Sequence, residues 1–82
     1  MKVTHLLKIH PAPFRDIVSG AKRAEYRDIR AHNIRAGDVL NLREYVDGDY
    51  TGRSLAVRVT HRQEGHGIPV GYAVLSIEAV GV

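Results

Sequence analysis

Only one stretch of this 82-residue chain has the apolar spacing of a helix, and this limits the folds that the chain can adopt. Phe14, Ile17 and Val18 recur at i, i+3 and i+4, which predicts a short helix with one apolar face. Pro13 stands at its start and Gly20 follows its end, as is usual for helix boundaries. A single helical crossover excludes an array of βαβ units, because each parallel pair in such an array needs a connection of that kind.

The other apolar stretches alternate or are rich in β-branched residues, as strands are. They predict five strands, at residues 3–9, 23–28, 39–45, 55–61 and 72–80. Residues 47–52 hold two glycines and predict the turn of a hairpin between the third and fourth strands, with Tyr50 inside the turn. We therefore expect an α+β fold that is mainly β: a small, mostly antiparallel β-barrel of about five strands, with one short helix after the first strand. Closure of the barrel would protect the strand edges.

The length allows one hydrophobic core, so we expect a single domain over residues 1–82 that buries only about 60–65% of its unfolded surface. The chain has no cysteine, so disulfides and thiolate metal sites cannot stabilise it. No apolar run is as long as a membrane span or a secretory signal, and a cytoplasmic protein without a membrane partner is expected. The net charge of +3 and a pI near 9.6 suit a polyanionic partner.

Residues 20–27 carry the clearest indication of a site, because Lys22, Glu25 and Arg27 lie close together there. Such a cluster can hold an anion or a base. Glu25 and Arg27 share one face of the second predicted strand, so they could also simply pair with each other, or with Arg43 across the sheet. Strict alternation places Lys22 on the opposite face, so the three side chains converge only if a turn or a bulge redirects the lysine.

The five histidines show no spacing typical of a metal site, so we expect neither a metal nor a cofactor. His5 falls on the same strand face as Leu7 and Ile9, which indicates a buried, hydrogen-bonded histidine rather than a ligand. His66 lies in the glycine-rich loop of residues 63–71, which either closes over a ligand or is a plain connection. We therefore place His66, and not His5, among the candidate site residues.

Several stretches together resemble a known family. The first predicted strand, the helix and the motif G-x-K-x-x-E-x-R at residues 20–27 resemble the ASCH domains, the activating-signal-cointegrator homology members of the PUA-like superfamily. Other stretches resemble a small phage and bacterial branch of unknown function within that superfamily: Gly37-Asp38-Val39-Leu40, Leu42-Arg43-Glu44-Tyr45, Tyr50-Thr51-Gly52-Arg53 and Gly71-Tyr72-Ala73-Val74-Leu75. The resemblance implies a PUA-like barrel with a cleft beside the helix, in a superfamily where RNA binding and modified-nucleoside chemistry recur.

One position departs from the enzymatic members of that superfamily. In the ASCH enzymes that hydrolyse acetylcytidine, the position matching Glu25 looks like a threonine nucleophile beside the motif lysine, with a further glutamate in a longer distal segment. Here a carboxylate stands at the threonine position, and Glu64 lies near the shortened distal segment. The threonine route therefore does not carry over, although Glu25 could exchange a proton with Lys22 as a catalytic pair.

We expect an RNA- or nucleotide-binding domain with a basic cleft around the motif, in which cations contact phosphate and tyrosines stack on an unpaired base. The candidate ligand-binding residues are Lys8, Lys22, Glu25, Arg27, Arg43, Tyr45, His66 and Tyr72. One alternative is a small hydrolase of modified nucleosides, similar to the acylcytidine amidohydrolases, or a ribonuclease, with Lys22 and Glu25 as the catalytic residues. Another is a protein-interaction module of phage or bacterial origin. The oligomeric state is left open.

Overall fold

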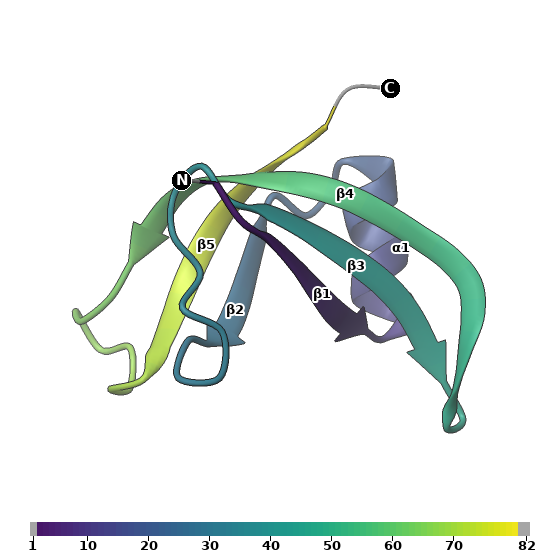
Figure 1. Ribbon diagram of the computed structural model, residues 1–82, viewed down its shortest axis with the longest axis horizontal. Coiled ribbons are helices and arrows are strands. Elements are labelled where there is room, and N and C mark those ends of the chain that lie inside the picture. Colours follow the sequence, from purple (N-terminus) through teal and green to yellow (C-terminus); the bar gives the residue numbers. More distant parts are fainter. Residues whose placement is uncertain (1, 81–82) are drawn as a thin grey trace.

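The computed structural model describes residues 2–80 as a curled β-sheet with one helix against it (Figure 1). In chain order the elements are β1 (Thr4–Ile9), α1 (Pro11–Ser19), β2 (Ala24–Asp28), β3 (Val39–Val46), β4 (Asp49–Gln63) and β5 (Tyr72–Ala79). The five strands and the helix after the first strand agree with the sequence-based prediction. β4 is the main difference, because it begins at Asp49 and ends at Gln63, well before the start of the predicted strand and two residues beyond its end.

The strands follow the order β1-β3-β4-β5-β2 in a single sheet. β1 pairs with β3 in parallel, whereas the other three pairings are antiparallel. The sheet curls so that its two end strands, β1 and β2, turn toward one another without pairing within the described residues (Figure 1). Mostly antiparallel pairing is thus confirmed, but the expected closed barrel is wrong: the sheet is mixed and forms a half-barrel.

The helix begins at Pro11, two residues before the predicted start. Pro11 and Pro13 have no backbone N–H, so two of the donors that a helix start normally leaves unpaired are missing. This explains why the N-cap residue His10 provides no side-chain hydrogen bond. At the other end Gly20 adopts a left-handed conformation and donates its N–H to Ile17 O at 3.0 Å. No helix within residues 2–80 is long and apolar enough to cross a membrane.

The hydrophobic core fills the inner face of the curled sheet. Alternate residues of β3, β4 and β5 are fully or almost fully buried there, and they are Leu40, Leu42, Val57, Val59, Ala73, Leu75 and Ile77. Phe14 and Ile17 of α1 close one part of this core, and Ile34 from the connection between β2 and β3 closes another. Val18 was predicted on the same helix face but is 59% exposed, and it lines a hollow beside the helix.

The hairpin between β3 and β4 is tighter than predicted. Asp47 and Gly48 alone form the turn, with φ of 53° and 82°, and Tyr45 pairs with Tyr50 across it. Tyr50 therefore belongs to a strand and not to a turn, and the prediction that placed it inside the turn is wrong. The second glycine of the region, Gly52, lies within β4 where the register with β3 shifts, and its φ is 93°.

Candidate functional site

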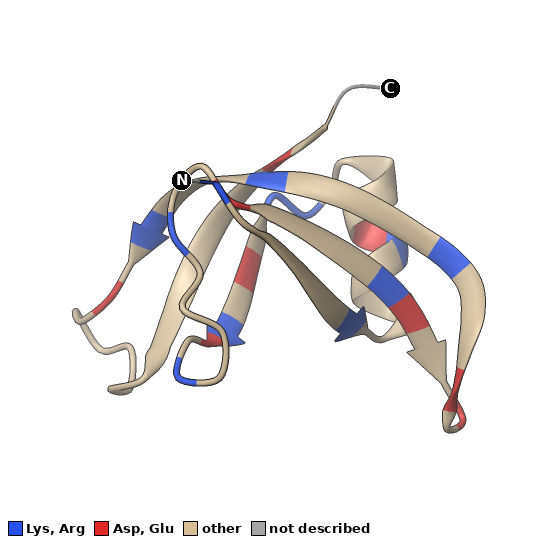
Figure 2. Ribbon diagram, in the orientation of Figure 1, with Lys and Arg blue, Asp and Glu red and all other residues tan. Residues whose placement is uncertain are grey.

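The motif residues Lys22, Glu25 and Arg27 converge in the structure. Lys22 Nζ lies 2.7 Å from Glu25 Oε1, and Arg27 Nε lies 2.8 Å from Glu25 Oε2. The Glu25 side chain is only 5% exposed, whereas Lys22 and Arg27 are 35% and 21% exposed. Figure 2 shows an acidic band within β2 between a basic segment that precedes the strand and a basic segment near its end. The predicted pairing of Glu25 with Arg27 is confirmed, whereas Arg43 does not take part.

The segment before β2 redirects the lysine. β2 begins at Ala24, so Lys22 precedes the strand and does not follow its alternation. The left-handed Gly20 reverses the chain after α1, and the Lys22 N–H then bonds Asp16 O at 3.0 Å. This turn brings the lysine side chain to the same side as Glu25, as the convergence of the motif requires.

The arrangement makes Glu25 an anchor rather than a free carboxylate. Each of its oxygens accepts a short hydrogen bond from a cation, and burial keeps water from replacing either one. A general base or a nucleophile needs an oxygen that can reach the substrate. The geometry therefore favours a structural role for Glu25, with Lys22 and Arg27 as partly exposed cations on either side of it.

Arg27 also connects the two end strands of the sheet. Its Nη2 donates to the backbone oxygen of Lys8 in β1 at 3.0 Å, while its Nε holds Glu25 in β2. The guanidinium thus spans the opening of the half-barrel, where the strands do not pair. A hollow of about 380 Å³ lies at this opening, and Lys8, Arg27 and Tyr50 are among the residues that line it.

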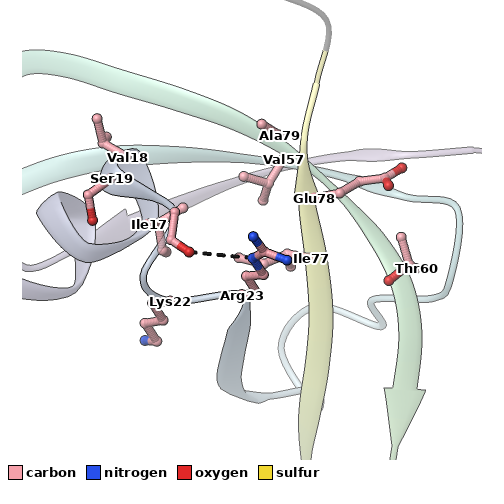
Figure 3. Close-up of a pocket in the computed structure, with 11 residues that line it drawn as sticks. Ile17, Val18, Ser19, Lys22, Arg23, Val57, Thr60, Ile77, Glu78 and Ala79 are labelled. Atoms are coloured by element: carbon pink, nitrogen blue, oxygen red, sulfur yellow. Dashed lines mark hydrogen bonds between the residues drawn. The ribbon is translucent and has the colours of Figure 1, made fainter.

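A larger hollow of about 500 Å³ lies beside α1, and we call it the helix-side hollow. Ile17, Val57 and Ile77 give it an apolar part, and its polar lining includes Arg23 and Lys22. Arg23 lies between Ile17 and Ile77 in the view of Figure 3, whereas Lys22 points away from both. The motif segment therefore forms one wall of a cleft beside the helix, but Glu25 and Arg27 do not line it.

The other predicted binding residues fall on different parts of the molecule. Lys8, Arg43 and Tyr45 lie together on the outer face of β1 and β3, opposite the core. Tyr72 also lies on an outer face, because it alternates with the buried Ala73, and it stacks on Tyr26 with ring centroids 5.3 Å apart. The eight predicted residues thus lie on separate surfaces and do not share one cleft.

His66 lies in the loop between β4 and β5 and is exposed. Its φ of 53° is a left-handed conformation, which is uncommon for a residue other than glycine. No hydrogen bond or ion pair within the described residues joins its side chain to the motif cluster. The structure therefore gives His66 no connection to the candidate site.

The prediction that His5 is buried and hydrogen-bonded is confirmed. Its Nε2 lies 2.9 Å from Asp38 Oδ2, and both residues are buried. Burial alone would raise the pKa of Asp38, but hydrogen bonds from His5 and from the backbone N–H groups of Arg35 and Val3 outweigh it and lower the pKa. The histidine serves to hold the start of β1 against the start of β3.

Glu44 is a third buried carboxylate, after Glu25 and Asp38, and the sequence analysis did not single it out. Arg53 donates to both of its oxygens at 2.7 and 2.8 Å, and the Thr51 hydroxyl donates at 2.7 Å. These bonds, led by those from Arg53, lower the pKa of Glu44. The shift of register near Gly52 places both donors opposite Glu44, so this network fixes the bulge in the hairpin.

Two residues outside the predicted set contribute to the sites. Tyr50 lies beside Tyr45, with ring centroids 5.0 Å apart, and Arg23 lines the helix-side hollow. The Asp47-Gly48 pair is a known signal for a two-residue hairpin turn, and this signal would have placed Tyr50 opposite Tyr45. No comparable signal marks Arg23, because its place depends on how α1 packs against β4 and β5.

Comparison with known proteins finds one phage relative and one family. It is 40% identical over 60 residues to a protein of Escherichia phage P2 described as "Uncharacterized 12.9 kDa protein in GpA 3'region". The aligned part covers 73% of this chain and 54% of the phage protein, so the chain spans about half the length of this relative. The match to a protein family is longer. Residues 4–77 match the family described as "Domain of unknown function (DUF3850)", and the chain belongs to this family.

Proposed function

We propose that the protein is an ASCH-type, PUA-like domain that binds RNA or a nucleotide-like ligand in the helix-side hollow. The motif G-x-K-x-x-E-x-R supports this proposal, because Lys22, Glu25 and Arg27 form one contact network just after the helix. The position of α1 directly after β1 and the strong curl of the sheet also support it.

The observation that carries the proposal is the composition of the helix-side hollow. Its volume of about 500 Å³ falls within the usual range for ligand pockets. The apolar part can cover one face of a base, and Arg23, which has no ion pair within residues 2–80, can meet a phosphate. Glu78 at the same hollow can accept hydrogen bonds from a ribose hydroxyl or a base amino group.

The enzymatic alternatives have less support. A hydrolase or ribonuclease that used Lys22 and Glu25 for proton transfer would first have to separate a 2.7 Å ion pair whose carboxylate is buried. The second oxygen of Glu25 would still be held by Arg27. A protein-interaction module is the remaining alternative.

Fluorescence polarisation with a labelled single-stranded 12-nucleotide RNA, at low and at moderate salt, tests the proposal. We expect binding that weakens as salt rises, because cations that contact phosphate release counterions. Arg23→Ala should weaken binding by about fivefold or more, and Lys22→Ala by less, since the Lys22 ammonium already pairs with Glu25. Unlabelled uridine monophosphate should shift the NMR signals of residues that line the hollow.

Arg35→Ala is the matched control, because Arg35 is exposed, has no ion pair in the described part of the chain and lines neither hollow. It removes the same charge and should reduce affinity only slightly. Absence of RNA binding at low salt together with absence of shifts by the mononucleotide would refute the proposal. Equal effects of Arg23→Ala and Arg35→Ala would refute the location in the hollow.

A further inference from the structure

Four side chains on the outer face of the sheet form a group that the helix-side hollow does not include. Lys8 comes from β1, Arg43 and Tyr45 from β3, and Tyr50 from β4. The pairing of the strands places Lys8 beside Arg43 and Tyr45 beside Tyr50. Figure 2 shows the two basic positions on the neighbouring strands β1 and β3. We call these four residues the outer-face cluster.

The two cations of the outer-face cluster rest on aromatic rings instead of carboxylates. Lys8 Nζ lies 4.4 Å from the centre of the Tyr45 ring, and the Arg43 guanidinium carbon lies 4.2 Å from that of Tyr50. Neither cation forms an ion pair within residues 2–80. Six other basic side chains do pair with a carboxylate, and they are Lys22, Arg27, Arg30, Arg53, Arg58 and Arg62. The outer-face cluster therefore keeps its positive charge.

A phosphate group would bind these cations more strongly than the rings do. A cation above an exposed tyrosine is held weakly, whereas a hydrogen bond between a cation and a charged oxygen is short and strong. A phosphate that drew Lys8 or Arg43 aside would also uncover the face of the ring beneath it. An uncovered tyrosine face on a sheet is the surface on which unpaired bases stack in proteins that bind single strands.

We propose that the outer-face cluster binds single-stranded nucleic acid, with Lys8 and Arg43 on phosphates and Tyr45 and Tyr50 against bases. Paired bases cannot present their faces to a sheet, so a duplex is a poorer ligand. Asp47 lies at the tip of the hairpin between β3 and β4. Its negative charge repels phosphate, so the binding surface ends there. The inference uses no residue of the helix-side hollow, so it does not rest on the function proposed for that hollow.

Fluorescence polarisation with two 12-residue probes tests this inference: a labelled oligouridylate, and an abasic phosphodiester chain of the same length. Tyr45→Leu should weaken binding of the oligouridylate by about tenfold and leave binding of the abasic chain unchanged. Tyr45→Phe, which keeps the ring, should bind as the unchanged protein does. Lys8→Gln should weaken both probes and lower the slope of log K against log salt by about one.

Tyr26→Leu and Arg35→Gln are the matched controls. Tyr26 is an exposed tyrosine stacked on Tyr72, and Arg35 is an exposed cation without an ion pair among residues 2–80, so these variants lose the same groups elsewhere. Thermal unfolding of each variant checks that the protein is folded. The inference fails if the oligouridylate and the abasic chain bind equally, because the surface would then bind any polyanion without contacting bases. It also fails if only Arg23→Ala, and no change in the outer-face cluster, weakens the oligouridylate.

Discussion

At the scale of single residues, Glu25 is best understood as an internal anchor for two cations. Its carboxylate joins Lys22, which precedes β2, to Arg27, which reaches across to β1. Loss of the negative charge would leave both cations partly buried without their shared acceptor, and an unsatisfied buried charge is costly. Replacement of Glu25 is therefore expected to change the stability of the fold rather than a catalytic step.

We expect Glu25→Gln to lower the free energy of unfolding by about 1–3 kcal/mol, less than for a fully buried pair because Lys22 and Arg27 keep contact with water. Urea unfolding at neutral pH, followed by circular dichroism, measures the change. Glu64→Gln is the control: Glu64 pairs with Arg62 at the surface, so its loss should change stability by less than about 0.5 kcal/mol. Unchanged stability of Glu25→Gln would reopen a catalytic role for this carboxylate.

Residue-scale predictions succeeded where local alternation decides the outcome. The shared face of Glu25 and Arg27 and the buried position of His5 follow from strand periodicity, and both are confirmed. Alternation also places Glu44 on the same strand face as Leu40 and Leu42, but the donors that pair with Asp38 and Glu44 could not be predicted in this way. A carboxylate is buried only where the fold supplies enough donors, and those donors come from residues that are distant in the sequence or displaced by a bulge.

At the scale of elements, Asp38 joins the start of β1 to the start of β3. It accepts hydrogen bonds from the Val3 N–H, the Arg35 N–H and the His5 ring. His5 belongs to β1, Val3 directly precedes it, and Arg35 lies in the connection before β3, so one side chain fixes the register of the parallel pair. The lowered pKa of Asp38 means that this junction depends on the ionised carboxylate.

The pH dependence of stability should show this junction. Because the pKa of Asp38 is lower in the folded protein than its ordinary value of 3.8, its contribution is present above that value and is lost as the pH falls through the folded pKa. Asp38→Asn should therefore cost about 1–3 kcal/mol at about pH 6 and progressively less below about pH 4. Urea unfolding over this pH range measures the difference between the two proteins. A difference that stays constant down to about pH 2 would contradict the expectation.

Elements were predictable where the signals lie close together in the sequence. The helix ends at Gly20 as predicted, and β3 and β5 differ from the predicted strands by one residue each. The predictions for the start of α1 and for the hairpin turn were wrong, because two sequence signals competed in each case. Two prolines both suit the first turn of a helix, and two glycines both suit a turn.

At the scale of the whole molecule, the curl of the sheet brings the end strands β1 and β2 to face one another. The sequence does not predict which strands become neighbours, because alternation reports the buried face of a strand and not its partner. The parallel pairing of β1 with β3 spans α1 and β2, and such long-range pairing leaves no local signal. The distribution of the predicted binding residues over separate surfaces follows from the same topology.

The open side of the half-barrel depends on Arg27, and this can be tested. Arg27→Met keeps much of the apolar stem but removes the hydrogen bond to Lys8 O, so amides of β1 should exchange about tenfold faster while those of β4 and β5 change little. Hydrogen–deuterium exchange with mass spectrometry resolves these segments. Arg58→Met is the control, because Arg58 and Glu78 join strands that already pair, and it should leave exchange in β1 unchanged. Equal acceleration in all strands would show that Arg27 stabilises the whole sheet and does not specifically close its open side.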